Sequence, residues 1–475
     1  MIYMGLPQIV DLIGIIVVVH NRREDLFKLL LSLQRQHYSA YEILIIDNCS
    51  TDDISDVQHL PAVEYMRLEE NIGFVSGMIK GINYLLSKNR FRFIWVLDSD
   101  LEVAPTALER LVAVMQEQRD IGVAGCVIYN TYDRDVVVEA GADVNLRTGI
   151  VSAKFCNERL PSMNSIVDCD FIASGGGGSL FSVEALNAAG LHDERYHFLW
   201  EDTDYGLCLK KHGFRVVVVS DAVVYHPPFT EKRNPNIYAY YGVRNPLLTV
   251  AKYSSGLRMP YYLFVNLCRY LRIGLLMLFS GRKKFAQLTF SAISDYVSGR
   301  FGKADLMEIE QTDPPVGEGG LKVEKRVVIL GMGSKSAVQS AVEFVRAACR
   351  GEIILIVQCY RRELLADLAV DRIITYDDRA PDLFREYWKT GMAIMHHGGC
   401  LINTDLRVVS LLSYFGYRTF DWDHREGKLF RSRYGLLAAW RPAAAVVLAH
   451  ILALFILPMV WLASLKHKAK QPVLP

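Results

Sequence analysis

The sequence lacks two patterns that mark common classes of protein. Its nine cysteines include no Cys-x-x-Cys pair, so neither a zinc site nor a disulfide framework is indicated, and a reduced, cytosolic setting fits better. The sequence also lacks an excess of charge, because 53 Lys and Arg against 52 Asp and Glu give a formal net charge of +1. Without a global basic field, nothing in the charge indicates nucleic acid as a partner.

Short apolar runs alternate with helical patterns through the first 120 residues. The runs predict buried strands at 13–19, 42–46, 63–68 and 93–97, and the helical patterns cover 26–33, 76–87 and 105–115. Each strand is followed directly by polar or acidic residues. Alternation of this kind implies an α/β fold with a mostly parallel sheet. Since ligands of open α/β sheets bind outside the carboxyl ends of the strands, a site is expected there.

Two carboxylates follow the fourth strand, at Asp98 and Asp100. In an extended segment, residues i and i+2 share a face, so these two side chains can reach one point. They repel each other there unless a cation or a proton lies between them, and hard oxygen ligands suit Mg²⁺ or Mn²⁺. An isolated Asp-x-Asp is more often two solvated acids at a strand end, so the other polar strand ends give this pair its weight.

Several motifs together resemble the family 2 glycosyltransferases of the GT-A fold. They are His20-Asn21-Arg22, residues 46–52, residues 71–74 with Gly77, residues 97–100, residues 175–181, residues 199–204 and His226. The likeness covers roughly residues 10 to 250 and is strongest to rhamnosyl- and galactofuranosyltransferases that build bacterial surface polysaccharides. The rhamnosyl branch often has Asn-Pro-Asp where this chain has Asp98-Ser99-Asp100, a departure that favours the galactofuranosyl type.

The resemblance implies a nucleotide-sugar site at the strand ends. It assigns the pyrimidine N3–H to Asp47 and the lining of the nucleotide pocket to His20 and Asn21. Asn71 and Gly73 are expected near the nucleoside or diphosphate, where a glycine permits close approach of the backbone.

The resemblance also implies a metal site. Asp98 is expected beside the ribose and the metal, Asp100 on the metal, and His226 as a third ligand. A lone histidine is more often structural, and the ligand set does not distinguish Mg²⁺ from Mn²⁺.

Family 2 enzymes invert the anomeric centre, which requires one general base for the acceptor hydroxyl. The first candidate is Asp202 and the second is Glu201, because neighbouring carboxylates and partial burial raise a carboxylate pKa. The simpler interpretation is that these are ordinary acidic residues at a helix N-terminus, where the helix dipole favours them, and this interpretation suits Asp204. Trp200 is either a platform for the acceptor sugar or a buried core tryptophan.

Two further features allow a functional and a structural interpretation. The glycine run 175–178, with Gly176 and Gly177 at its centre, is either slack in the chain or a bare backbone beside the acceptor or the donor phosphates. Arg244 either contacts a diphosphate or a lipid head group, or forms a structural ion pair.

The expected domains continue past the catalytic one, which is predicted at 1–255. They are amphipathic interfacial helices at 256–304, a linker at 305–323, a smaller Rossmann-like α/β domain of unknown role at 324–425, and a membrane-spanning or re-entrant helix at 436–466. The last helix contains the uncharged run 443–465, which is long enough to cross a bilayer, and Pro458 inside it allows a kinked, re-entrant path. In the Rossmann-like domain, Gly331-x-Gly333 lacks the third glycine of a dinucleotide fingerprint.

The sequence therefore predicts an inverting, metal-dependent glycosyltransferase on the cytoplasmic face of the plasma membrane. Its donor is expected to be a UDP- or dTDP-sugar and its acceptor a lipid-linked or polysaccharide glycan. One alternative is a catalytically silent GT-A-like membrane scaffold, and another is a nucleotide-dependent oxidoreductase that uses the 324–425 domain. Turnover that depends on Asp202 separates the enzyme from the scaffold, and cofactor absorbance in the purified protein would indicate the oxidoreductase.

Overall fold

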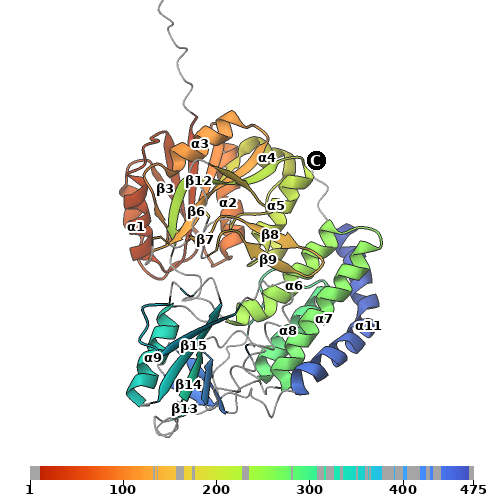
Figure 1. Ribbon diagram of the computed structural model, residues 1–475. Coiled ribbons are helices and arrows are strands. Elements are labelled where there is room, and N and C mark those ends of the chain that lie inside the picture. The colour runs from red at the N-terminus through yellow and green to blue at the C-terminus, as the bar shows by residue number, and fades with distance from the viewer. Residues whose placement is uncertain are drawn as a thin grey trace, which may run out of the picture.

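The computed structural model of the protein shows an α/β unit followed by a helical unit and a second, smaller sheet (Figure 1). The residues that it describes are 11–131, 134–135, 137–156, 165–173, 177–226, 235–279, 282–306, 315–316, 326–331, 335–348, 351–358, 362, 365–376, 390, 400–403, 418–423, 428–431 and 440–469.

The first sheet has ten strands, and most of the neighbouring strands on its main path are parallel. Its main path runs β10-β12-β6-β11-β4-β1-β2-β3, with β5 paired to β12 and β7 paired to β6. The strands are β1 (Ile13–Val19), β2 (Tyr41–Asp47), β3 (Val63–Arg67), β4 (Phe93–Asp98), β5 (Glu102–Val103), β6 (Ile121–Asn130), β7 (Val137–Glu139), β10 (Ile166–Asp168), β11 (Ser179–Ser182) and β12 (Arg215–His226). The four expected strands are β1 to β4, and they lie side by side in parallel in the order β4-β1-β2-β3. Strand β11 is antiparallel to both of its neighbours, β4 and β6. The predicted α/β fold with a mostly parallel sheet is confirmed.

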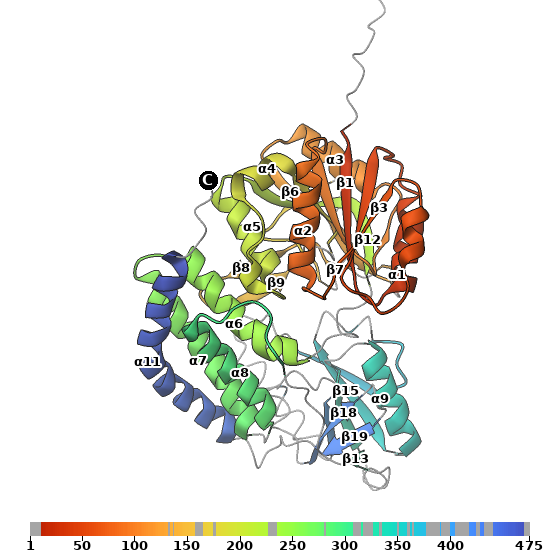
Figure 2. The same cartoon turned by 180° about the vertical axis from the view of Figure 1, so that it is seen from behind.

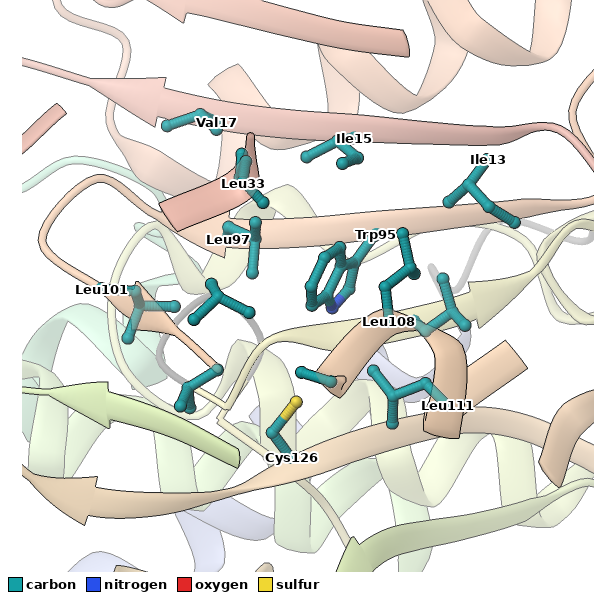
Figure 3. Packing of buried hydrophobic residues seen from close by; sticks show 14 of the residues in the cluster. Ile13, Ile15, Val17, Leu33, Trp95, Leu97, Leu101, Leu108, Leu111 and Cys126 are labelled. Carbon is teal, nitrogen blue, oxygen red and sulfur yellow. The ribbon is translucent and has the colours of Figure 1, made fainter. Parts of the chain in front are cut away.

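Helices cover both faces of this sheet. One face packs against α1 (Arg23–Leu33) and α3 (Ala107–Glu117), and the other against α2 (Phe74–Ser87), α4 (Val183–Ala189) and α5 (Glu201–Lys211). Figure 3 shows the core on the side of the sheet that α1 and α3 cover. At its centre Trp95 is fully buried and donates its indole N–H to the carbonyl oxygen of Gly178 at 2.7 Å. Because β1 and β4 are apolar on both faces, the polar residues of these segments are confined to the strand ends.

A small antiparallel hairpin, β8 (Ala142–Asn145) with β9 (Ile150–Ala153), projects from this unit toward the helices. The Asn266 side chain, on α7 (Arg258–Phe279), donates to the carbonyl oxygens of Leu146 and Arg147 in the hairpin turn. The hairpin is thus attached to the helical unit.

The helical unit combines α6 (Pro235–Tyr253), α7 and α8 (Lys283–Ser298) with α11 (Trp440–Ala469) from the far end of the chain. Both views show α11 lying along α7 (Figures 1 and 2). A stripe of small residues on α11 that includes Ala445, Ala449 and Ala453 is fully buried in this contact. Small side chains let the two helix backbones approach closely.

The second sheet has seven strands in the order β13-β19-β18-β17-β14-β15-β16, with α9 (Lys335–Ala348) packed against it. Its strands are β13 (Pro315–Val316), β14 (Arg326–Leu330), β15 (Glu352–Gln358), β16 (Arg372–Tyr376), β17 (Cys400–Asn403), β18 (Arg418–Asp423) and β19 (Lys428–Arg431). The five strands that lie side by side in the order β18-β17-β14-β15-β16 are parallel to one another. The sheet includes residues 315–316, which lie in the expected linker, and it extends past residue 425.

Candidate active site

Two carboxylates and an imidazole meet at the carboxyl ends of the central strands. Asp98 is the last residue of β4, Asp100 follows in the next turn, and His226 is the last residue of β12. One ligand atom from each of the three lies within 4.8 Å of the others, and His226 Nε2 is 3.5 Å from Asp100 Oδ1. The three residues predicted as metal ligands are thus brought together, in an arrangement that can hold a divalent cation.

The charges at this point explain why it suits a cation. Burial, followed by the charge of Asp100, raises the pKa of Asp98 to about 7, and the Arg22 guanidinium opposes that increase. Arg22 donates a hydrogen bond directly to Asp100 Oδ2. Two oxygen ligands and one imidazole are a donor set that Mg²⁺ and Mn²⁺ accept, and a cation relieves the carboxylate repulsion. The residues present therefore fit the expected metal.

Asp47 ends β2 and is fully buried. Its Oδ1 accepts from the backbone N–H of Ser50 at 2.8 Å, and its Oδ2 accepts from Tyr65 Oη at 2.6 Å and from Arg67 Nη1 at 2.5 Å. Burial raises its pKa, but the hydrogen bonds from Tyr65 and Ser50 and the charge of Arg67 outweigh burial and lower it. Asp47 is therefore already bonded within the protein, and of its partners Arg67 has a side chain that is half exposed.

The two other residues predicted to line the nucleotide pocket lie in the loop after β1. His20 is exposed, and Asn21 has a positive φ of 53°. Asn21 Oδ1 accepts from the backbone N–H and the hydroxyl of Thr51, at 2.6 and 3.0 Å. Asn21 thus fastens the β1 loop to the β2 loop, and both Asn21 and His20 are exposed at this edge of the site.

Gly73, the predicted close-approach glycine, is close to a side chain of the protein itself. It has φ +86° at the start of α2, and a Cβ atom there would lie 2.6 Å from Cε1 of His197. Asn71 Oδ1 accepts from the Gly73 N–H at 3.0 Å. The glycine is needed for the contact between this loop and the segment before α5.

The acids at the start of α5 belong to the same charge cluster. Burial, followed by the charge of Asp202, raises the pKa of Glu201 to about 8, and burial raises that of Asp202 to about 6 against the hydrogen bonds from Thr203. Asp202 also raises the pKa of Asp98, which indicates that the end of β4 faces the start of α5. Glu201 is buried and its Oε2 has no hydrogen-bond partner among the described residues, whereas Asp202 is half-buried. Of the two base candidates, Asp202 is thus more open to solvent.

The residues predicted on the acceptor side differ in their exposure. Trp200 is half-buried with a left-handed backbone, and it packs against the core of the helical unit. Gly177 is buried, its carbonyl oxygen accepts from the N–H of Cys126, and a Cβ atom there would lie 2.5 Å from Ile172. Tight packing therefore explains Gly177, and Gly176 lies outside the described residues.

Two charged residues of the motifs have structural partners. Asp204 Oδ2 accepts from Lys252 Nζ of α6 at 2.6 Å, and Asp204 Oδ1 accepts from Tyr196 Oη at 3.0 Å. Arg244 is 1% exposed and donates to the carbonyl oxygens of Arg195 and Gly302. In the described structure the Arg244 side chain therefore faces the protein interior, which favours the structural interpretation, with carbonyl oxygens as its partners in place of the expected ion pair.

Sequence reasoning did not single out Arg22 or Arg67 as site residues. Arg22 stands in the His20-Asn21-Arg22 motif directly after β1, so its position at a strand end was a usable signal. Arg67 ends β3 beside Asp47 in the register of the parallel sheet, and that register is not visible in the sequence.

Comparisons with known proteins agree with the motifs. Residues 14–154 match the family model described as glycosyl transferase family 2, and residues 93–283 match the model described as glycosyl transferase family group 2.

Curated relatives align with parts of the chain. It is 30% identical over 142 residues to the undecaprenyl-phosphate 4-deoxy-4-formamido-L-arabinose transferase of Sodalis glossinidius, a match that covers 27% of this chain and 41% of that protein. It is 23% identical over 230 residues to the galactofuranosyltransferase GlfT1 of Mycolicibacterium smegmatis, covering 47% of this chain and 74% of that protein. The chain thus spans less than half the length of the first relative. The crystal structure of GalNAc-T7 with UDP, GalNAc and Mn²⁺ aligns with a TM-score of 0.43 and 17% identity, over 55% of this chain and 51% of that one.

Proposed function

We propose that the chain is an inverting glycosyltransferase, because residues 14–154 match the glycosyl transferase family 2 model. It transfers a sugar from a UDP- or dTDP-sugar to a lipid-linked or polysaccharide acceptor in bacterial surface-glycan synthesis. The observation that carries this proposal is the convergence of Asp98, Asp100 and His226 at the strand ends, opposite Asp202. A scaffold without catalysis has no need of these repelling carboxylates.

In this proposal Asp98, Asp100 and His226 hold Mg²⁺ or Mn²⁺. The bound cation supplies positive charge to the departing diphosphate. Arg22, which reaches the same point, adds a second positive charge beside the diphosphate. Exposed His20 lines the nucleotide side of the site, and Arg67 opens to admit the base to Asp47.

Asp202 acts as the general base. Its carboxylate takes the proton of the acceptor hydroxyl while that oxygen attacks the anomeric carbon. The bond from the anomeric carbon to the diphosphate oxygen breaks, the diphosphate leaves with the electron pair, and the configuration inverts. A pKa raised to about 6 suits this role, because a base near the working pH combines ionisation with proton affinity. Trp200, at the start of the same helix, is the candidate platform for the acceptor sugar.

The proposed acceptor is lipid-linked, and two observations support it. The Sodalis glossinidius relative is named for an undecaprenyl-phosphate substrate. In the described part of the chain, two helices are long and apolar enough to cross a membrane, Arg258–Phe279 and Ala444–Lys468, and the second is much less buried within the protein than the first. The outward face of α11 exposes large apolar side chains that include Leu454, Phe455 and Leu462.

We place the enzyme at the cytoplasmic face of the plasma membrane, with the outward face of α11 against lipid. The inward face is held by the protein, since Ser464 bonds to Tyr296 and Lys468 Nζ donates to the carbonyl oxygen of Ser254 at 2.7 Å. Anchoring of this kind raises the effective concentration of an acceptor that is confined to the bilayer. The donor sugar is proposed to be galactofuranose, which the Asp98-Ser99-Asp100 sequence and the GlfT1 relative favour.

The test is a binding and transfer screen with UDP-, dTDP- and GDP-sugars in the presence of Mn²⁺, Mg²⁺ or EDTA. We expect one pyrimidine nucleotide sugar to bind in a metal-dependent way, and Asp100→Ala to abolish that binding. Asp120→Ala is the matched control, because Asp120 is exposed and lies directly before β6, at the amino end of that strand and away from the carboxyl ends that form the site. Binding of no donor, or binding indifferent to metal and to Asp100, would leave the scaffold as the better account.

A further inference from the structure

The segment between Tyr196 and Glu201 has an unusual backbone. His197, Leu199 and Trp200 have φ values of 56°, 62° and 72°, in the left-handed region that residues with a Cβ atom seldom adopt. Trp200 is the residue before α5, so the strained segment leads directly into Glu201 and Asp202. Strained backbone of this kind persists only where the surrounding structure holds it.

One buried amide holds this segment. Asn245 of α6 is fully buried, and its Nδ2 donates toward the carbonyl oxygens of Tyr196, Phe198 and Leu199 at 2.9, 2.9 and 2.7 Å. An amide nitrogen carries two hydrogens, so the three oxygens share both of them. The side chain therefore gathers three carbonyl groups of the strained turn, those of Tyr196, Phe198 and Leu199, at one point.

Arg244 fixes the orientation of that amide. Its Nε donates to Asn245 Oδ1 at 3.0 Å, which directs Nδ2 toward the carbonyl groups. Its Nη2 donates to the carbonyl oxygen of Arg195 at 3.1 Å, so the guanidinium holds the start of the same segment. A buried guanidinium is costly to desolvate, and carbonyl acceptors compensate that cost only while this backbone arrangement persists.

We propose that Asn245, oriented by Arg244, is a positioning residue that sets the placement of the Asp202 carboxylate through the 196–200 backbone. The inference rests on the proposed function, in which Asp202 is the base. Asn245 fixes the direction in which the backbone enters α5, because it bonds to carbonyl groups of the residues that precede this helix. A small displacement of the Asp202 carboxylate should lower the rate of transfer by a large factor. Donor binding at the ends of β1 to β4 should not change when Asn245 is replaced.

The variant Asn245→Ala tests this inference, and Thr249→Val is its matched control. Thr249 is equally buried one turn later on α6, and its hydroxyl bonds to Tyr196 Oη at 2.9 Å. We expect Asn245→Ala to lower kcat about 100-fold while the dissociation constant of the donor stays within about 2-fold. Thr249→Val should change kcat by less than about 3-fold. A folded Asn245→Ala enzyme with near-normal kcat, or with kcat and donor affinity reduced together, would overturn the proposal.

A second variant and a second measurement keep the test decisive. Asn245→Asp retains the size of the side chain and the acceptor for Arg244 but replaces the donating nitrogen, and we expect the same loss of kcat. Hydrogen–deuterium exchange over residues 197–204 should rise in both Asn245 variants and stay unchanged in Thr249→Val. Unchanged exchange in a folded Asn245 variant would contradict the inference. A wild-type chain without transfer activity would defeat the proposed function alone, since the exchange comparison still decides whether Asn245 holds the segment.

Discussion

The Nε2 atom of His226 lies 3.5 Å from Oδ1 of Asp100, although the two residues follow different strands of the sheet. This contact brings the carboxyl end of β12 to the turn after β4 and completes a three-residue ligand set with Asp98. Because a cation relieves the repulsion between the two carboxylates, the cluster should behave as a single binding unit.

We therefore predict that Asp100→Asn and His226→Ala each weaken Mn²⁺ binding by at least about tenfold, because the first replaces a charged ligand with a neutral amide and the second removes the imidazole. Titration of the purified chain with Mn²⁺, followed by electron paramagnetic resonance, measures the effect directly. The Asp120→Ala control should bind Mn²⁺ as the wild type does. Equal Mn²⁺ affinity in all three variants would show that the cluster is not the metal site.

The general base gives the second prediction. Asp202→Asn keeps the shape of the side chain but cannot take a proton, so kcat should fall about 10²–10⁴-fold while the donor remains bound. Glu201→Gln should cost less, because Glu201 is buried and Asp202 is the more open of the two. Steady-state transfer rates and donor titrations of both variants check this. A larger loss in Glu201→Gln than in Asp202→Asn would exchange the two roles.

The third prediction concerns the ion pair beneath α5. Lys252 Nζ lies 2.6 Å from Asp204 Oδ2 and 2.9 Å from Asp193 Oδ2, and the Lys252 side chain is only 8% exposed. Lys252→Met leaves the buried Asp204 carboxylate without this cation, while Asp193 keeps Arg195 as a partner, and the free energy of unfolding should fall by about 3–5 kcal/mol. Lys210→Met is the control, because Lys210 pairs with Asp170 while 44% exposed and should cost less than about 1 kcal/mol. Urea denaturation of the three proteins tests the difference, and equal midpoints would contradict it.

Much of the fold could be predicted because β1 and β4 are apolar along almost their whole length. The run Ile13–Val19 agrees with β1 at both ends, since a strand buried on both faces ends where polar residues begin. For the same reason the sequence located Asp98, Asp100 and His226 at strand ends, and the parallel sheet brings these ends together.

The remaining features depend on contacts that sequence patterns do not carry. Gly73 was expected beside a ligand, but the close approach is to the ring of His197, on a segment far along the chain. In the sequence, Asn245 cannot be distinguished from other polar residues of a helix. Only the fold shows that its side chain bonds to the carbonyl groups of Tyr196, Phe198 and Leu199. Likewise, the occupied oxygens of Asp47 follow from the pairing of β2 with β3, which sets Arg67 beside Asp47.

The last prediction is a pH dependence of stability that arises from His192. Its ring stacks on Tyr205 with centroids 3.9 Å apart and meets the ring of Phe181 edge-on. Burial, aided by the charge of Lys252, lowers the pKa of His192 to about 3 from an ordinary value of 6.5. Below pH 6.5 the unfolded chain therefore binds a proton that the folded chain does not, and stability is lost as the pH falls toward 3.

Between pH 6 and pH 4 this one group should lower the free energy of unfolding by about 2.5 kcal/mol. His192→Phe retains the ring stack and removes the proton site, so the decline measured by urea denaturation should be shallower by that amount. Other acids titrate in the same range, and the comparison of variant with wild type cancels their effect. The control His59→Phe replaces an exposed histidine and should keep the wild-type slope. If His192→Phe kept that slope as well, the folded chain would have to accommodate a charged His192, which its aromatic surroundings oppose because they offer a cation little of the solvation that water provides.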